Sequence, residues 1–287
     1  MISQEIMQRI KEIEISTRRI MASVQLGNVK PIKKGAGFEF DQIRAYEMGD
    51  DVRFIDWKST ARSSQLLVRQ YLEERNRTII LCVDTSSSMF FSSTETLKFE
   101  LAANVAATLG LVGIYRNDNV GLVTFSDKIE KVIAPGKGKN HAYQIMNTLF
   151  SITPAVAKKS SLSVCAHYLQ SLPEKRALIF VISDFFAPFE QGIWNSLQQR
   201  KEIIAIRCLD KEEEQMSASA LIWMQDMETD KKMLVPTASL NIQNALKDYQ
   251  SSQKELLRKV RIDCIDLDTK HSFVDPLIAY FKHKRLS

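Results

Sequence analysis

The segment TIILCVDTSSSM, residues 78–89, decides the fold class of this chain. Its first seven residues are almost wholly apolar, which is typical of a central strand in a parallel sheet that is covered on both faces. The strand ends in an acid, Asp84, and three consecutive serines follow after one further residue. A carboxylate and several hydroxyls within one tight turn are hard oxygen ligands, the kind that a small divalent cation prefers.

Apolar strand-like runs alternate with helix-like segments along the rest of the chain, after an N-terminal helix whose isoleucines share one face. Further strands are expected at VGLVTF (120–125), KIEKVIA (128–134), ALIFVISD (177–184), IIAIRCL (203–209) and IDCIDL (262–267). Helices are expected over 94–115, 141–150, 162–172, a segment ending at 199, 240–259 and 273–284. This alternation predicts an α/β fold, a doubly wound and mostly parallel sheet with right-handed crossovers.

Two strands in this pattern end in an acid, at Asp84 and at Asp184. Ligands of doubly wound sheets bind outside the carboxyl ends of the strands, at the point where the strand order reverses. If the order is 3-2-1-4-5-6, these two strands are neighbours there, and the two carboxylates face each other at one edge of the sheet. Like charges this close raise each other's proton affinity unless a cation lies between them, so we expect a divalent cation at this edge.

Composition narrows the function classes. The formal net charge of +5 comes from both signs spread along 287 residues, so we expect no nucleic-acid partner. The N-terminal sequence lacks the apolar stretch of a secretory signal, and the longest weakly polar run, 101–115, is shorter than the roughly 20 residues of a membrane span. We therefore expect a cytoplasmic protein without a membrane span. Four widely separated cysteines and no metal-ligand spacing of histidines indicate reduced core thiols and no zinc site.

Simpler interpretations of Asp84, Ser86 and Ser88 exist. These residues could only cap a helix, which would make the protein a metal-free structural scaffold. A cap needs only one of them, however, and does not require an acid after a second central strand. The same acids could instead serve a metal-dependent hydrolase, because a bound divalent ion can activate water. Against this, the chain has no GxSxG motif, and no histidine lies within DTSSSM or VISDFF.

The spacing Asp84-x-Ser86-x-Ser88 resembles the DxSxS motif of von Willebrand factor A domains. The metal-ion-dependent adhesion site of that family adds a Thr from a later loop and an Asp after a later strand. Asp184 matches the Asp, and Ser160 aligns with the Thr, although Ser161 could supply the ligand instead. The resemblance implies Mg²⁺ or Mn²⁺ held by Asp84, Ser86, Ser88, Ser160 and Asp184, with one position left for a Glu or Asp side chain of a protein partner.

Two longer stretches extend the resemblance over most of the chain. GAGFEFDQIRAYEMGDDVRFIDWKSTAR (35–62) and LDTKHSFVDPLIAYFKHKR (267–285) resemble the bacterial family numbered 58 among the domains of unknown function, which contains a von Willebrand A-like domain. The family resemblance implies a non-catalytic, metal-dependent protein-binding module. It also implies an adaptor or co-chaperone role with a MoxR-type AAA+ ATPase.

We expect two parts in the chain. Residues 1–74 form an N-terminal helix and a Gly- and charge-rich family-specific segment, and residues 75–287 form the von Willebrand A-like domain with the C-terminal strands and helix. The block 35–62 can be a subdomain with Trp57 in its core, or it can present a surface to the ATPase. As a subdomain it would be held together by pairs between two sets of residues, Asp50, Asp51 and Asp56 on one side and Arg44, Arg53 and Arg62 on the other.

Overall fold

The computed structural model describes residues 4–25, 38–48, 50–63, 65–73, 77–90, 92–93, 95–154, 158–174, 177–210, 221–225, 232–236 and 240–286. The chain divides into two compact units, one of residues 1–26 with 77–287 and one of residues 27–76. The expected boundary between 74 and 75 separated the N-terminal helix from the α/β part, and here the structure differs. Helix α1 (Gln4–Gln25) packs against other helices of the larger unit, because an apolar face with Ile13 and Ile20 is buried there.

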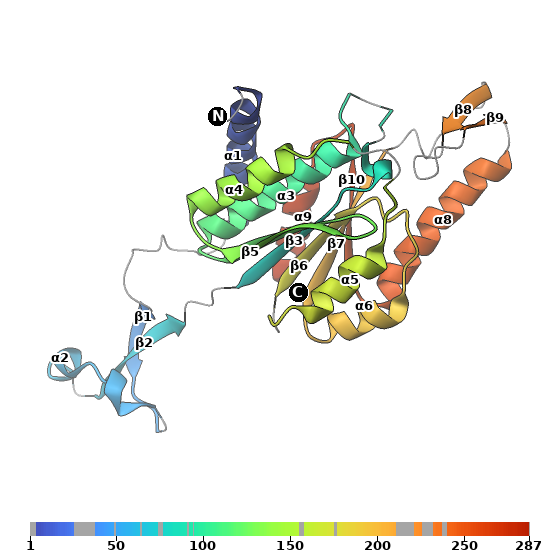
Figure 1. Ribbon diagram of the computed structural model, residues 1–287. Coiled ribbons are helices and arrows are strands. Elements are labelled where there is room, and N and C mark those ends of the chain that lie inside the picture. The colour runs from blue at the N-terminus through green and yellow to red at the C-terminus, as the bar shows by residue number, and fades with distance from the viewer. Residues whose placement is uncertain are drawn as a thin grey trace. The chain divides into compact units, whose positions relative to one another are not determined.

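A six-stranded sheet forms the centre of the larger unit, and its order is β10-β7-β6-β3-β4-β5 (Figure 1). The strands are β3 (Thr78–Asp84), β4 (Asn119–Phe125), β5 (Ile129–Gly136), β6 (Leu178–Ser183), β7 (Glu202–Leu209) and β10 (Asp263–Asp268). When only the strands of this sheet are numbered along the chain, the order from β5 to β10 is 3-2-1-4-5-6. The predicted doubly wound α/β fold is therefore confirmed, and β3 and β6 are neighbours at the switch point.

Edge strand β5 is the exception to the parallel arrangement, because it pairs antiparallel with β4. Only three residues, 126–128, connect the two strands, and the Ser126 N–H donates to the Lys128 carbonyl within this turn (2.8 Å). Strands joined by so tight a turn run antiparallel, since a parallel connection needs a long crossover.

Helices cover both faces of the sheet. Residues of α1, α3, α4 and α9 share one buried cluster with the sheet, and residues of α5, α6 and α8 share the other. These helices are α3 (Lys98–Tyr115), α4 (Lys139–Phe150), α5 (Leu162–Ser171), α6 (Gln191–Gln198), α8 (Leu240–Lys259) and α9 (Val274–Leu286). None of the helices within the described ranges is long and apolar enough to cross a membrane.

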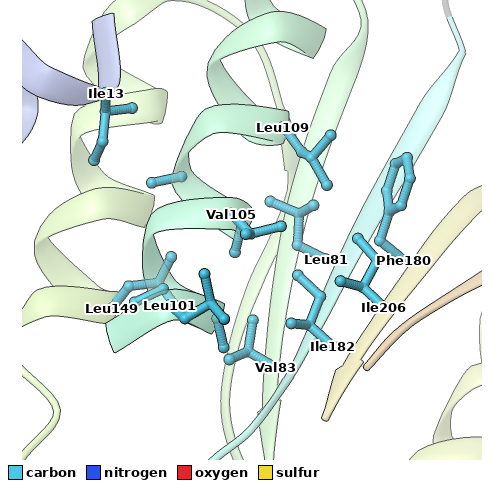
Figure 2. Close-up of a cluster of buried hydrophobic side chains, with 14 of the residues drawn as sticks. Ile13, Leu81, Val83, Leu101, Val105, Leu109, Leu149, Phe180, Ile182 and Ile206 are labelled. Carbon is cyan, nitrogen blue, oxygen red and sulfur yellow. The ribbon is translucent and has the colours of Figure 1, made fainter. Parts of the chain in front are cut away.

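Alternation along β3 assigns its side chains to the two faces. Leu81 and Val83 lie in the α3-side cluster, beside Leu101 and Val105 of α3 (Figure 2). The intervening Cys82 belongs to the α5-side cluster. Strand β6 follows the same rule, so that its even-numbered residues face α3 and its odd-numbered residues face α5. The residues at the ends of these strands follow the same alternation between the two faces.

The smaller unit contains the antiparallel pair β1 (Phe38–Ala45) and β2 (Leu67–Glu73) and two short helical turns, η1 (Val52–Phe54) and α2 (Trp57–Thr60). A separate hairpin, β8 (Leu221–Gln225) with β9 (Lys232–Pro236), lies in the larger unit.

The expected ion pairs of the smaller unit form in part. Arg44 pairs with Asp50, and Arg53 pairs with Asp51. Asp56, however, caps α2 and pairs with Arg69, so the expected Arg62 partner is not the one the structure shows. The interpretation that places Trp57 in the core of a subdomain is wrong. Trp57 is the first residue of α2, directly after the cap, and its side chain is 67% exposed.

Candidate metal centre

The DxSxS segment begins at Asp84, the last residue of β3 at the switch point, and continues into the short 3-10 helix η2 (Ser87–Phe90). Backbone contacts hold this turn to the neighbouring loops. The Thr85 N–H donates to the Phe125 carbonyl (2.7 Å), and the Ser87 N–H donates to the Lys158 carbonyl (2.9 Å). The Lys158 N–H in turn donates to Ser87 Oγ (2.8 Å). Because of this reciprocal pair, the loop before α5 lies directly against the DxSxS turn.

Asp84 is fully buried and is the acceptor at the centre of the site. Its Oδ1 accepts the Ser86 N–H (2.8 Å), and its Oδ2 accepts the hydroxyls of Ser160 and Ser183, both at 2.7 Å. The register explains the contact with Ser183. Since Val83 pairs with Ile182, the next residue of β6, Ser183, lies opposite Asp84. Asp184, the next residue, therefore lies at the same edge. It does not directly face Asp84, whereas the sequence pattern predicts that the two carboxylates face each other.

The hydroxyls of Ser86 and Ser88 complete the cluster. Their Oγ atoms are 3.1 Å apart, because residues two apart in the tight turn present their side chains to the same side. Ser86 is buried, whereas Ser88 is partly exposed. The Ser88 side chain thus lies where the site meets solvent.

Ser160 and Ser161 have different surroundings. Ser160 donates to Asp84, as described above, and is 8% exposed. Ser161 is the N-cap residue of α5, and its Oγ accepts the Val164 N–H (3.3 Å). Its own N–H donates to the Ser126 carbonyl (3.0 Å). The loop therefore brings Ser160 to the acid and uses Ser161 to begin the helix.

Asp184 lies on the α3 side of the strand ends, as the alternation along β6 requires. Its Oδ2 accepts a hydrogen bond from Lys98 Nζ (3.1 Å), and its Oδ1 accepts the Phe186 N–H (3.0 Å). The side chains of Lys98 and Asp184 are 2% and 3% exposed, so the ion pair is buried. Phe185, between Asp184 and Phe186, adopts a left-handed backbone (φ 57°), which residues with a side chain rarely do.

Electrostatics at the site disfavour the ionised form of Asp84. Burial raises the pKa of Asp84 to about 6, and the nearby charge of Asp184 raises it as well. Hydrogen bonds from Ser183, Ser160 and the Ser86 backbone oppose this rise in the pKa, because they favour the carboxylate. A positive charge placed at the site would favour the ionised form further.

The donor set fits a hard divalent cation, because every candidate ligand is an oxygen. A serine hydroxyl can donate its hydrogen to a carboxylate while its oxygen lone pairs stay available to a cation. Ser160 already donates to Asp84 in this way. Within the described ranges, no group of three or more His, Cys, Asp or Glu side chains is arranged to hold a metal, so a cation here would depend on the hydroxyls.

Two residues of the site were missed in the sequence. Ser183 is a hydroxyl in an otherwise apolar strand, directly before Asp184, and this position was a usable signal. Lys98 begins a helix that is otherwise rich in Ala and Leu, yet it is buried. A lysine at the first position of an apolar helix was the only local sign of its role.

Comparison with known proteins places the chain in a family. The model of the family described as "Protein of unknown function DUF58" matches residues 42–256, well over half of the chain. An uncharacterized protein of Mycobacterium bovis is 26% identical over 225 residues, which cover 77% of this chain and 70% of that protein.

Among solved structures, BatB of Bacteroides thetaiotaomicron, a conserved hypothetical protein, aligns with a TM-score of 0.48 at 12% identity and covers 74% of this chain and all of its own. The VWA domain of SpRpn10 aligns with a TM-score of 0.39 at 9% identity, over 71% of this chain and 94% of that domain. Likenesses below a TM-score of 0.5 are too weak to carry an argument about this chain.

Proposed function

This chain belongs to the DUF58 family of proteins of unknown function, and from that premise and the geometry of its switch-point site we propose that it is a non-catalytic, metal-dependent protein-binding module. The cation would be Mg²⁺ or Mn²⁺. The partner would be a protein that offers an acidic side chain to it.

One observation carries the proposal: three hydroxyls and two acids from three separate segments meet at one edge of the sheet. Asp84 is the last residue of β3, and Ser86 and Ser88 lie in the turn that follows it. Ser160 comes from the loop before α5, and Asp184 directly follows β6. A helix cap would use one of these residues, whereas this arrangement gathers oxygens from all three segments. The ligands proposed here are those that the resemblance to von Willebrand A domains implies.

The residues would divide the work as follows. The hydroxyls of Ser86, Ser88 and Ser160 would hold the cation. Asp84 would orient the Ser160 hydroxyl and the Ser86 backbone, whose hydrogen bonds it accepts. Asp184 would add charge, either directly or through water. The cation, when bound, supplies an open position for a carboxylate, since Mg²⁺ in proteins usually keeps waters that can be exchanged. The partly exposed Ser88 marks the side from which a partner would approach.

For the partner we propose a MoxR-type AAA+ ATPase, with this chain as its adaptor or co-chaperone in the cytoplasm. The support is the family resemblance of residues 35–62 and 267–285. It is independent of the geometry of the metal centre.

The proposal is tested in two steps with purified protein. A titration with Mn²⁺ should show one site in the wild type and none in Asp84→Ala. Capture of a MoxR-type ATPase from the same genome should then require Mg²⁺ and fail with EDTA or with Asp84→Ala. The matched control is Asp118→Asn. Asp118 is another buried acid; it lies directly before β4, at the other end of the sheet, and accepts the Arg77 N–H. Equal capture under all conditions would contradict the proposal.

A second candidate, a metal-free interaction scaffold, is favoured by one specific observation. Each carboxylate oxygen of Asp84 and Asp184 already accepts a hydrogen bond, and Asp184 has the ammonium group of Lys98 as a counter-ion. On this alternative the protein binds its partner equally well with EDTA. The Mn²⁺ titration separates the two candidates directly.

A further inference from the structure

We propose that Lys98 is a built-in counter-ion of the candidate metal centre: its ammonium group holds Asp184 while no divalent cation is bound, and a divalent cation must compete with it for that carboxylate. This inference rests on the proposed function for its competition step. The pairing itself rests on the contact between Lys98 Nζ and Asp184 Oδ2, at 3.1 Å in a buried environment.

The position of Lys98 is unfavourable by itself. It is the first residue of the 18-residue helix α3, where the helix dipole disfavours a positive charge. Its side chain is also only 2% exposed, and burying an ammonium group is costly without a charged partner. Two local rules are therefore broken at one residue, which is the usual sign of a site rather than of plain packing.

Asp184 offsets both costs, and Lys98 in turn offsets a cost of the site. Two buried acids near each other carry two negative charges that repel. With the ammonium group of Lys98, the net charge of the three side chains falls from two negative charges to one. The alternation along β3 and along β6 places the two acids on different sides. Asp84 points to the α5 side, where serine hydroxyls meet it, whereas Asp184 points to the α3 side, where Lys98 enters.

A second buried lysine of this chain shows what a purely structural role looks like. Lys201 is 5% exposed, and its ammonium group donates to the carbonyls of Leu169 and Leu172 at the end of α5 (2.5 and 3.0 Å). Both carbonyls lie in the last turn of the helix, where C=O groups lack partners further along the helix, although the Leu172 N–H also donates to the Leu169 carbonyl. Lys201 stabilises a helix end, whereas Lys98 occupies a helix start and reaches an acid.

The consequence is a site that is stable without metal and binds metal less tightly than its oxygen ligands alone would allow. Removing the charge of Lys98 should reverse both properties. The metal-free protein should become less stable, because two buried acids then lack a counter-ion. The metal should bind more tightly, because no ammonium group then competes with it for Asp184.

The experiment compares Lys98→Met with Lys201→Met, using Mn²⁺ as the probe. Methionine keeps most of the length of the lysine side chain and removes its charge. In EDTA, Lys98→Met should melt at a lower temperature than the wild type, and Mn²⁺ should raise its melting temperature by more than it raises that of the wild type. Calorimetric titration should show Mn²⁺ affinity increased on the order of tenfold or more, the change expected when a buried competing charge is removed. Lys201→Met should lower the melting temperature equally with and without Mn²⁺ and leave the affinity unchanged.

The outcomes separate this inference from the proposed function. Equal Mn²⁺ affinity in the wild type and Lys98→Met would overturn the competition and leave the metal-binding proposal intact. No binding by either protein would overturn the metal-binding proposal and the competition with it. Binding by Lys98→Met alone would support the competition and show that the wild-type site works without metal.

A double variant keeps the pairing testable if Lys98→Met folds poorly. Lys98→Met with Asp184→Asn removes both charges, so in EDTA it should melt above Lys98→Met alone. A double variant that is no more stable than the single one would overturn the pairing of Lys98 with Asp184.

Discussion

At the scale of single residues, the site combines groups that oppose and groups that favour a negative charge. Burial and the charge of Asp184 raise the pKa of Asp84, whereas hydrogen bonds from Ser160 and Ser183 lower it. Lys98 lies on the far side, against Asp184. The charge state of the centre is therefore set by the protein as well as by any cation, and this has a measurable effect on stability.

Asp84→Asn should remove a pH dependence from the metal-free protein. The folded-state pKa of Asp84, about 6, lies above the unfolded value of 3.8, so the folded state binds the proton more tightly. The resulting stabilisation is fully present below about pH 4 and is lost as the pH rises through about 6, with a total of about 2–3 kcal/mol. Urea unfolding in EDTA at pH 4.5, 6 and 7.5 measures this change. If the free energy of unfolding changed with pH in the same way in the wild type and in Asp84→Asn, the raised pKa of Asp84 would be contradicted.

Ser160→Ala should have the larger effect on Mn²⁺ affinity, and Ser161→Ala should have the larger effect on the free energy of unfolding. Ser160→Ala removes a hydroxyl that touches Asp84, so Mn²⁺ affinity should fall more in this variant. Ser161→Ala removes the N-cap of α5, so the free energy of unfolding should fall by about 1 kcal/mol with little effect on Mn²⁺. Calorimetry and urea unfolding of both variants make the comparison. If Ser161→Ala weakened Mn²⁺ binding more, the neighbouring serine would be the ligand.

Part of this site can be predicted from the sequence because it is local. Asp84, Ser86 and Ser88 lie within five residues, and the strand pattern alone brings Asp184 to the same edge. The remaining members depend on register and on which face of a strand meets which helix. Ser183 takes its place from the pairing of Val83 with Ile182, which one sequence does not reveal.

At the scale of helices and strands, the switch point depends on α3 packing closely on β3 and β4. The helix is apolar almost all round, and its residues Leu101, Val105 and Leu109 lie over the sheet (Figure 2). The strand types and their order could be predicted from apolar runs and the crossover rule. The antiparallel direction of β5 also follows from the sequence, because the expected strands 120–125 and 128–134 leave too few residues between them for a parallel crossover. Strand β1 was missed because a bulge between Phe40 and Gln42 interrupts its alternation.

Gly113→Ala tests this close packing. A Cβ at this position of α3 would lie 2.8 Å from Ile79 Cδ1 and 2.9 Å from Val120 Cγ2, closer than carbon atoms can pack. We expect a loss of about 1–3 kcal/mol in the free energy of unfolding, the usual cost of overpacking. Gly192→Ala, on α6 with no atom within 4 Å of the added Cβ, is the control and should stabilise slightly. Equal effects in urea unfolding would argue against tight packing at Gly113.

At the scale of the whole molecule, the larger unit is assembled from two separate pieces of chain. Residues 1–26 and 77–287 form it together, and the smaller unit is inserted between them in sequence. Helix α1 supplies buried isoleucines to the cluster on the α3 side, including Ile13 (Figure 2). Arg19 of α1 also pairs with Asp275 of α9 (2.9 Å). The N-terminal helix is thus part of the α/β core and does not belong to the inserted segment.

Ile13→Ala should destabilise the larger unit even though it lies far in sequence from the sheet. Its side chain is 3% exposed, and truncating a buried isoleucine to alanine costs about 2–5 kcal/mol. Ile15→Ala is the matched control, because Ile15 lies on the same helix and is 66% exposed. The control should change the free energy of unfolding by less than about 0.5 kcal/mol. Equal losses in the free energy of unfolding of the two variants, measured with urea, would show that α1 does not support the core.

The pairing of Arg19 with Asp275 also bears on the order in which the chain folds. These residues are 256 positions apart, so their contact closes a loop of nearly the whole chain. Contacts between distant residues form late, because the loop must be closed before they can stabilise anything. We therefore expect α1 to dock after the sheet and α9 have formed. The loss of stability in Ile13→Ala should then appear as faster unfolding, with the folding rate almost unchanged.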